Sequence, residues 1–329
     1  MNQFASQKEK PWLTPAEQVE HLKSKGVRFS LVSETDASEY LSRNNNYFRL
    51  RSYRTGFAKV DEGARKGQYA NLDFKMLVDL SIIDMLLRYE MLPVTLDIEH
   101  FEKIRLLGRI EQAGEDGYSI VADFLASYDR QNAKGEVANA IKDEIRRGES
   151  SPYVAGILLR YPTFDFPAWV LLELIAFGSF IYFYKFCAER FDDKAMLDEF
   201  YLLQNVKCLR NACAHNNCIL NDMSSGKPMF KARHAVSIAV GQIGTIGRGQ
   251  RKAKLSNDRL QQIATALYLH GRLASKGVRE SRAKNLQVLV RRMFKHIDYY
   301  KGNYQISSGF GFIASLIAAW FPSEDESLS

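Results

Sequence analysis

The chain of 329 residues is poor in the residue types that disulfide scaffolds and metal centres require. It contains only 4 cysteines, 6 histidines and 8 prolines. Cys208, Cys213 and Cys218 recur at every fifth residue without a CxxC pair, a spacing that does not gather metal ligands on one helix face. Because His215 lies among them, a zinc site is the less favoured alternative. We expect no metal and no other cofactor, and interpret the cysteines as reduced thiols of a cytoplasmic protein.

A targeting segment and a long uncharged hydrophobic run are also lacking. The N-terminus has no apolar stretch typical of a secretory signal. The most apolar run, Trp169–Cys187, contains Glu173 and is followed by a charged segment. A charge inside the run favours a buried core helix over a membrane span. We therefore expect a cytoplasmic protein without membrane contact.

Apolar residues and basic charge are well represented. Hydrophobic residues make up 46% of the chain, enough for a sizeable core in one large domain or two. Helix-forming residues throughout the chain and the scarcity of proline predict a mostly α-helical protein. The formal net charge of +7 favours a polyanionic partner such as nucleic acid, and a merely soluble basic protein is the alternative.

A capping pattern and an apolar stripe predict the first helices. The segment Thr14–Glu17 (TPAE) is typical of a helix start, and its helix is expected to run to about Lys25. From Leu72 to Leu92, apolar residues follow the spacing of a buried helix face. Pro93 is predicted to end this helix, and a separate helix is expected at Asp97–Ala113.

The second half of the chain is also predicted to be mainly helical. An apolar helix is expected near Pro167–Arg190 and a basic loop at Arg248–Lys254. Further helices are expected at Asp258–Leu273, Ser281–His296 and Phe312–Trp320. The cluster GESSP at residues 148–152 is the best boundary in the first half, which predicts regions 1–150, 151–225 and 226–329, with one compact unit as the alternative.

The hexapeptide Arg210–His215 (RNACAH) has residue types suited to cleaving RNA without a metal. Histidine moves protons near neutral pH, and arginine holds a phosphate. On a helix, Asn211 and His215 share a face, so the amide is placed to orient the imidazole. Cleavage needs both a base and an acid, and one motif histidine per chain supplies one of them. The pattern therefore predicts a composite site across a symmetric dimer.

Chance also produces this spacing. A histidine that caps a helix end or lies in the core is the competing interpretation. Arg291–His296 (RRMFKH) has the same spacing but lacks the asparagine and the small residues. We interpret that second copy as a solvated or RNA-facing basic surface, with a second catalytic motif as the alternative.

Two segments combine the features of an RNA-binding surface. The stretch Asn46–Phe57 interleaves aromatic residues with arginines, so bases would stack while the arginines neutralise phosphates. For this stretch we favour a helix with core aromatics and solvated arginines, whereas for the basic loop solvation and RNA contact are equal alternatives. The candidate RNA-binding residues are Arg49, Arg51, Arg54, Arg248, Arg251, Lys252 and Lys254.

Several separate blocks, in the same order, resemble the AbiD/AbiF-type abortive-infection (Abi-like) family with a HEPN ribonuclease domain. The blocks are Lys10–Val19, Leu22–Val27, Asn46–Tyr53, Leu72–Arg88, Trp169–Ser179 and Leu209–Asn217. The resemblance implies an Abi-like all-helical architecture with a HEPN-type helical bundle, whose core would be residues 151–225. It implies a metal-independent endoribonuclease that acts as a toxin in bacterial anti-phage defence. An RNA substrate, a small-RNA antitoxin and a homodimer are the implied partners.

Site residues carry over from the family one by one. Arg210 and His215 are the implied catalytic pair, and Asn211 is the implied orienting residue. Glu173 matches the glutamate of a W-x-x-x-E helix and is an implied supporting residue. Family members often carry an arginine soon after the histidine, whereas Asn216–Cys218 (NNC) follows here, which leaves a phosphate contact open.

Two other functions compete with this one. The first is a non-catalytic RNA-binding module that binds a small RNA partner through its basic and aromatic surfaces. The second is a structural or signalling interaction protein, which is supported only by the helical character of the chain.

Overall fold

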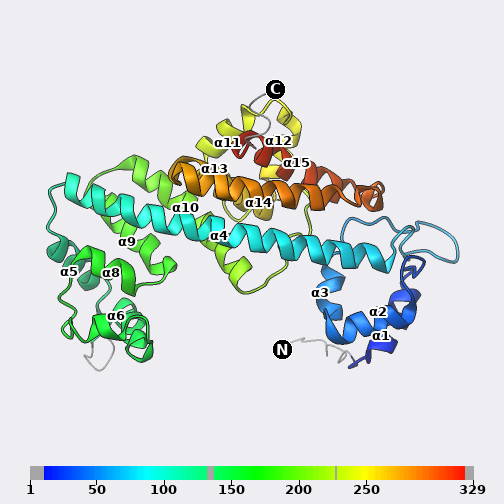
Figure 1. The fold of residues 1–329 in the computed structure, drawn as a ribbon, viewed down its shortest axis with the longest axis horizontal. Helices are drawn as coiled ribbons and strands as arrows, with labels where there is room; N and C mark the ends of the chain where they lie inside the picture. Colours follow the sequence, from blue (N-terminus) through cyan, green and yellow to red (C-terminus); the bar gives the residue numbers. More distant parts are fainter. Residues whose placement is uncertain (1–10, 132–136, 227, 323–329) are drawn as a thin grey trace, which may run out of the picture.

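The computed structural model describes residues 11–131, 137–226 and 228–322 (Figure 1). These residues form helices and one two-stranded antiparallel sheet, which confirms the predicted mostly α-helical class. The α-helices are α1 (Pro15–Ser24), α2 (Glu34–Arg43), α3 (Tyr47–Ser52), α4 (Phe74–Gln112), α5 (Gly117–Ser127), α6 (Ala140–Arg146), α7 (Ala155–Leu158), α8 (Ala168–Leu174), α9 (Phe177–Arg190), α10 (Lys194–Ala214), α11 (His234–Gly241), α12 (Arg248–Leu255), α13 (Asp258–Leu273), α14 (Lys276–Phe294) and α15 (Tyr304–Trp320). Two short 3₁₀ helices are η1 (Arg147–Ser150) and η2 (Ile297–Tyr300), and the strands are β1 (Arg130–Gln131) and β2 (Val137–Ala138).

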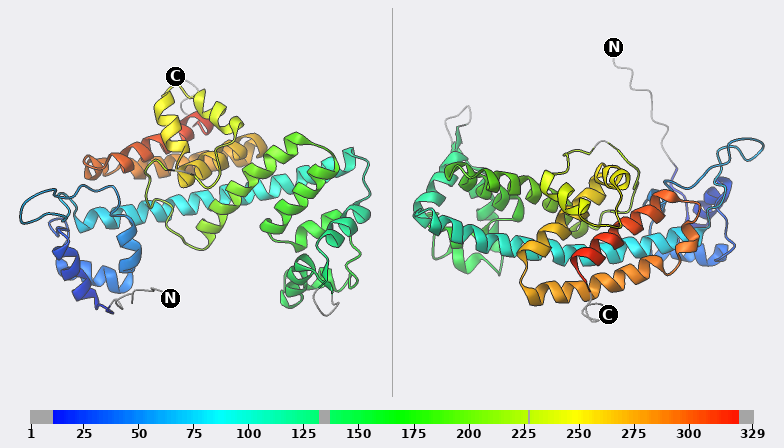
Figure 2. Two further views of the ribbon diagram at one scale, coloured as in Figure 1. Left: turned by 180° about the vertical axis from the view of Figure 1, so that it is seen from behind. Right: turned by 90° about the horizontal axis from the view of Figure 1, so that it is seen from above.

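The long helix α4 is the axis of the molecule, with α10, α13 and α14 packed along it (Figures 1 and 2). It continues through Pro93, so the prediction that this proline ends the helix is wrong. A proline inside a helix costs about 3 kcal/mol because it removes one hydrogen bond and crowds the preceding turn. Each fully buried Leu, Met or Val side chain contributes about 1.5–3 kcal/mol. Leu87, Met91 and Val94 are all fully buried around the proline, so packing offsets its cost.

The apolar run at 167–190 forms two helices, so the prediction of one helix there is wrong. Ile175 and Ala176 are both extended, with ψ of 144° and 160°, and separate α8 from α9. The carboxylate of Glu144 accepts hydrogen bonds from the N–H of Ala176 at 2.6 Å and from the hydroxyl of Ser179 at 2.5 Å. An acidic side chain at a helix start satisfies free N–H groups and complements the helix dipole, which stabilises the break. Within the described ranges, none of the helices is both long and apolar enough to cross a membrane.

The basic segment at 248–254 is helix α12, so the prediction of a loop is wrong. The helix begins after Gly247, whose backbone is extended. Leu255 at its end is buried, and α12 packs against α13. Local signals were more reliable elsewhere. The capping box between Thr14 and Glu17 starts α1 as predicted, and α13 has the predicted bounds.

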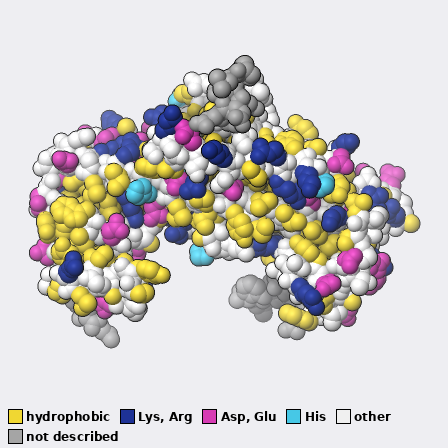
Figure 3. Space-filling model, in the orientation of Figure 1, with side chains coloured by type: hydrophobic (Ala, Val, Ile, Leu, Met, Phe, Trp, Pro, Cys, Tyr) yellow, Lys and Arg dark blue, Asp and Glu magenta, His cyan; other side chains and the backbone are white. Residues whose placement is uncertain are grey.

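Two groups of helices extend from the axis toward the same side of the molecule. The group α1–α3 lies at one end, and the group α5, α6 and α8 lies at the other (Figures 1 and 2). The space-filling view is hollowed between them (Figure 3). The C-terminal end of α10 lies on this hollowed side of the molecule, between the two groups (Figures 1 and 2).

Candidate functional site

The hexapeptide forms the last turns of α10. The helix continues to Ala214, and His215 is its C-cap. Asn216 has a left-handed backbone with φ of 57°, and its N–H donates to the carbonyl of Cys213 at 3.1 Å. The N–H of Asn217 donates to the carbonyl of Ala212 at 2.8 Å. This pair of bonds is a Schellman motif, which ends the helix sharply and leaves His215 exposed at its tip.

The motif side chains lie at different depths. Arg210 is half-buried, and its Nε is buried without a hydrogen-bond partner in the described part of the chain. Its Nη1 donates to Oδ1 of Asn211 at 3.3 Å. Asn211 and His215 are joined through the backbone, because the His215 N–H donates to the Asn211 carbonyl at 2.9 Å. Arg210 and Asn211 are therefore in contact, while the imidazole faces solvent.

A buried carboxylate fixes the chain just beyond His215. Oδ1 of Asp84, on α4, accepts hydrogen bonds from the N–H groups of Ile219 and Leu220, both at 2.8 Å. Oδ2 accepts the Tyr53 hydroxyl at 2.9 Å and an ion-paired hydrogen bond from Arg88. Burial raises the pKa of the Tyr53 hydroxyl, so it stays protonated and donates. We call Tyr53, Asp84 and Arg88 the Asp84 cluster; it ties α3 and α4 to the segment after the motif.

Two arginines reach the backbone next to His215. Arg49, on α3, donates from its guanidinium to the side-chain Oδ1 of Asn216 at 3.2 Å and also to the Asn216 carbonyl. Arg88 donates to the carbonyl of Asn217 at 3.3 Å. Burial lowers the pKa of Arg88 from its ordinary value, yet an arginine remains charged at neutral pH. Two guanidinium groups, from α3 and α4, thus contact Asn216 and Asn217, the two residues that follow His215.

A polar pocket of about 500 Å³ opens beside these arginines. Arg43, Arg49 and Arg88 line it together with the side chains of Asn216 and of the run Asn44–Asn46, and no acidic residue is among its lining residues. Asn216 belongs to both the pocket wall and the helix end, so the pocket starts one residue from His215. Its amides and guanidinium groups are suited to a ligand with phosphate and hydroxyl groups.

The residues of this site fall within a match to a protein family. The family model described as Abi-like protein matches residues 39–221, more than half of the chain. The chain belongs to the Abi-like protein family. This membership links it to abortive infection. Comparison with curated proteins and with solved structures gave no match.

The Abi-like match covers α3, α4 and α10, and therefore the whole motif, the Asp84 cluster and the polar pocket. Arg49, Arg51, Arg54 and Glu173 also lie inside it, whereas α11–α15 lie beyond it. Glu173 is exposed on α8 and makes no hydrogen bond or ion pair with any residue that the structure describes. The acid that caps the neighbouring helix is Glu144, which no sequence motif indicates.

The three arginines around α3 point to different places. Arg49 meets Asn216, while Arg51 and Arg54 line a second pocket on the other side of the helix. The aromatics are partly core, as the favoured interpretation expected: Tyr53 is buried, but Phe48 is 75% exposed. The basic stretch is thus neither a simple solvated face nor one continuous surface.

Of the four basic candidates of α12, two are exposed and two make hydrogen bonds within the protein. Arg248 and Lys252 are exposed. Arg251 is half-buried, and its Nη1 donates to the Ser237 carbonyl at 3.3 Å. Lys254 is buried, and its Nζ donates to the Ser308 hydroxyl at 2.6 Å. Only Arg248 and Lys252 of this set are free to meet a large partner in the described structure.

The second R-x-x-x-x-H spacing has a different setting. Arg291 is exposed near the end of α14, and the His296 ring stacks on Tyr299 with centroids 5.0 Å apart. On the face shown in Figure 3, lysine and arginine side chains gather over α14. This copy belongs to a basic helix edge rather than to a helix end in the hollow.

The Asp84 cluster is not among the residues that the sequence motifs predict. A signal was present, because Asp84 and Arg88 form an i,i+4 pair of opposite charge within an apolar helix stripe. Such a pair is costly to bury unless further hydrogen bonds satisfy it. The partners of Asp84 lie 135 and 136 residues away, which no local pattern reveals.

The cysteines near the motif are free thiols, and Cys213 is buried. Burial raises the pKa of Cys213 to about 12, so this thiol is protonated and unreactive at neutral pH. Over the ranges that the structure describes, no group of three or more His, Cys, Asp or Glu side chains is arranged to hold a metal ion.

Proposed function

We propose that this Abi-like protein is a metal-independent endoribonuclease of the HEPN type, acting as a toxin in anti-phage defence. The observation that carries the proposal is the end of α10, where His215 is exposed at the helix tip, Arg210 contacts Asn211, and the following segment is fixed by a buried carboxylate. A catalytic group must be both accessible and held in place. The family match over the same residues supports this assignment.

The reaction requires two things of the protein: proton transfer, and a positive charge that stabilises the phosphate. The 2′-hydroxyl of a ribose attacks the adjacent phosphorus, and the P–O bond to the 5′-oxygen of the next nucleotide breaks. His215 takes the hydroxyl proton or gives a proton to the departing oxygen, and Arg210 holds the non-bridging oxygens. The expected products are a 2′,3′-cyclic phosphate end and a 5′-hydroxyl end.

Arg49 is proposed to supply the phosphate contact that family members often make through an arginine soon after the histidine. Its guanidinium lies against Asn216, one residue beyond His215, and it lines the polar pocket. An RNA strand passing from His215 into this pocket would meet Arg49 within one nucleotide of the cut. A phosphate there would compete for a guanidinium that now binds an amide and a carbonyl.

A second copy of the chain is proposed to complete the site. Each chain brings one motif histidine to a helix end in the hollowed side, whereas the reaction needs a base and an acid. Two helix ends related by a twofold axis would place two histidines and two arginines around one phosphate. A small RNA is proposed as the restraining partner.

The test uses purified wild type, Arg210→Ala and His215→Ala with a mixed RNA substrate in EDTA. We expect wild type to cleave and each variant to lose about 10²–10⁴-fold in rate, the usual worth of a positioned acid or base. Light scattering gives the mass, and end analysis identifies the cyclic phosphate. The proposal is wrong if cleavage survives both substitutions and needs Mg²⁺.

The chain provides a matched control. Arg291→Ala combined with His296→Ala removes the same two residue types at the same spacing from the basic edge of α14. This variant should cleave RNA at the wild-type rate. Equal loss in both pairs of variants would indicate a general electrostatic effect rather than catalysis at α10.

A non-catalytic RNA-binding module is the second candidate function. The observation that favours it is the second pocket, where Arg51 and Arg54 meet other basic residues away from His215. In this case RNA affinity would fall steeply with salt while no product forms in any buffer.

A further inference from the structure

The second pocket, of about 450 Å³, is basic throughout. It lies among the end of α1, the end of α3 and the loop that follows, within the α1–α3 group of Figure 1. Its charged lining residues are Lys25, Arg51, Arg54 and Lys59, with no acidic residue among the lining. The rings of Phe57 and Tyr69 complete the wall.

In the part of the chain that the structure describes, none of the four cations is neutralised by another side chain. Within the described residues they form no ion pair and no side-chain hydrogen bond, and Nε of Arg54 is buried without a partner. By contrast Lys23, two residues before Lys25, pairs with both Glu20 and Glu34. Four like charges around one cavity repel one another, and an anion in the cavity relieves the repulsion.

Aromatic rings hold two of the cations in the wall. The Arg54 guanidinium lies 5.7 Å from the ring centre of Tyr47 and 5.8 Å from that of Tyr69. Nζ of Lys59 lies 5.5 Å from the ring centre of Tyr69. A cation over a ring face is attracted to it without losing its charge, so these groups stay available to an anion.

The backbone around the pocket is built to a fixed shape. The N–H of Tyr69 donates to the carbonyl of Lys25 at 2.8 Å, and Val60 pairs with Gln68 at 2.8 Å across the loop. Gly26 has φ of +84°, and a Cβ there would lie 2.9 Å from the Tyr69 backbone. Because only glycine fits this approach, the pocket walls are joined by a specific contact rather than by chance proximity.

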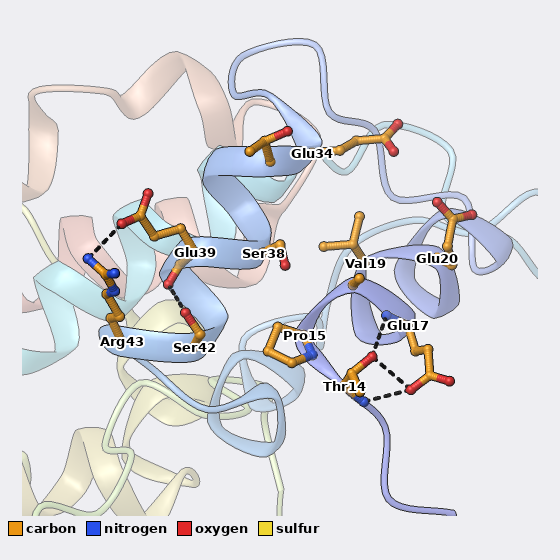
Figure 4. A pocket seen from close by; sticks show the side chains of 12 residues that line it. Thr14, Pro15, Glu17, Val19, Glu20, Glu34, Ser38, Glu39, Ser42 and Arg43 are labelled. Carbon is orange, nitrogen blue, oxygen red and sulfur yellow. Dashed lines mark hydrogen bonds and ion pairs between the residues drawn. The ribbon is translucent and has the colours of Figure 1, made fainter.

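Another pocket shows that basic lining is not general in this region. A cavity of about 740 Å³ between α1 and α2 is lined by Glu17, Glu20, Glu34 and Glu39, with Arg43 paired to Glu39 at 2.9 Å (Figure 4). It would repel the anion that the basic pocket attracts. The sign of the charge therefore changes between neighbouring pockets of the same helix group.

We propose that the basic pocket binds the terminal phosphate of an RNA strand, with the adjoining base against Tyr69. A terminal phosphomonoester carries nearly two negative charges at neutral pH, whereas an internal phosphodiester carries one, and four unpaired cations suit the former. The inference rests on the proposed function in one respect, that RNA is the ligand, and does not depend on RNA being cut. The pocket would thereby select strand ends, at the 5′ or the 3′ side.

The test measures binding in EDTA, with His215→Ala protein so that cleavage does not intervene. Three oligoribonucleotides of one sequence carry a 5′-phosphate, a 3′-phosphate or hydroxyls at both ends. We expect one phosphorylated strand to bind about tenfold more tightly than the hydroxyl strand, since a charge-assisted hydrogen bond contributes at least that much. The strand that gains affinity identifies the end.

The test variants are Lys25→Gln and Arg51→Gln, singly and combined. Both residues are exposed and make no side-chain hydrogen bond in the described structure, so their replacement leaves the fold intact, as circular dichroism should confirm. The combined variant should bind all three strands alike. As control, Arg248→Gln with Lys252→Gln, exposed cations of α12, should keep the preference for the phosphorylated strand.

Two results would overturn the inference: no preference in the parent protein, or a preference that survives the combined variant. Either result leaves the proposed nuclease untouched, because that function is judged by cleavage with Arg210 and His215 varied. Conversely, if the cleavage test shows that the protein is not a nuclease, the binding test still decides whether the pocket prefers a terminal phosphate.

Discussion

Asp84 accepts a hydrogen bond from the backbone N–H of Leu220 at 2.8 Å across 136 residues of sequence. This contact joins the longest helix of the molecule to the segment that follows the R-N-x-x-x-H motif. Both groups are buried, and Arg88 and Tyr53 occupy the second carboxylate oxygen. The position of the chain beyond His215 therefore depends on a charge in the core.

Asp84→Asn should destabilise the protein and loosen this segment. The substitution leaves Arg88 buried without its carboxylate, a change that costs about 3–5 kcal/mol. Urea unfolding gives the loss of stability, and hydrogen exchange at residues 217–220 gives the loosening.

Asp79→Asn is the matched control for that substitution. Asp79 is also buried on α4, where it binds Arg292 at 2.6 Å and the Tyr300 hydroxyl at 2.5 Å, away from the motif. It should lower stability without raising exchange at residues 217–220. Equal exchange in both variants would show that Asp84 acts only through global stability.

The helix end itself can be tested at Asn216. Its φ of 57° lies in the left-handed region, which costs about 1–2 kcal/mol for a residue with a Cβ and most for a branched one. Asn216→Val should lower the free energy of unfolding by about this amount, whereas Asn216→Gly should change it little. A neutral effect of valine, measured in urea, would contradict the Schellman end.

Stability should depend on pH through Glu102. Burial raises the pKa of this carboxyl from an ordinary 4.5 to about 7. The folded state then binds more protons than the unfolded state between about pH 4.5 and 7, so stability falls as pH rises through this window. Glu102→Gln should flatten the dependence and be more stable than wild type at pH 8, by about 1–3 kcal/mol.

Glu199, which shares the guanidinium of Arg105 with Glu102, should give a pH dependence of the opposite sign. Burial acts to raise its pKa, but hydrogen bonds from Tyr184 and Arg109 outweigh burial and lower it. Its stabilisation is therefore present at neutral pH and is lost as pH falls below the ordinary value. Thermal unfolding of Glu199→Gln across pH should show a loss confined to the higher pH range, and the reverse trend would refute the assignment.

Glu144 and Glu173 should differ in what they support. Glu144→Ala removes the acceptor for Ala176 and Ser179 at the start of α9 and should cost about 1–2 kcal/mol. Glu173→Ala removes an exposed side chain and should change stability by less than about 0.5 kcal/mol. If Glu173→Ala nevertheless abolishes RNA cleavage in a protein of wild-type melting temperature, the residue acts at the site directly.

Local signals in the sequence predicted local structure well. The helix start at Thr14 and the bounds of α13 depend on residues within one or two turns, and both are confirmed. Whether α4 continues through Pro93 depends on the packing of α13 and α14 against it, which the local sequence pattern does not contain. The prediction that Pro93 ends the helix was wrong because burial of the surrounding side chains offsets the cost of the proline.

The candidate site was predictable in part for the same reason. The motif at 210–215 is contiguous, so its position at a helix end follows from its own residues. Arg49 and Asp84 contact the segment just after the motif, at Asn216 and Ile219, from 167 and 135 residues away. Their contribution depends on how three distant helices pack, and it becomes visible only once those helices are placed.

The short helix α3 has a thermodynamic consequence. Its six residues carry Arg49, which holds Asn216, and Arg51, which lines the basic pocket, while Tyr53 at its cap joins Asp84. A ligand that shifts α3 therefore shifts the segment after His215 as well. By linkage, an anion in the basic pocket would change the affinity for an anion beside Arg49 by some factor. An anion beside Arg49 would change the affinity of the basic pocket by the same factor, although the two sites are not in contact.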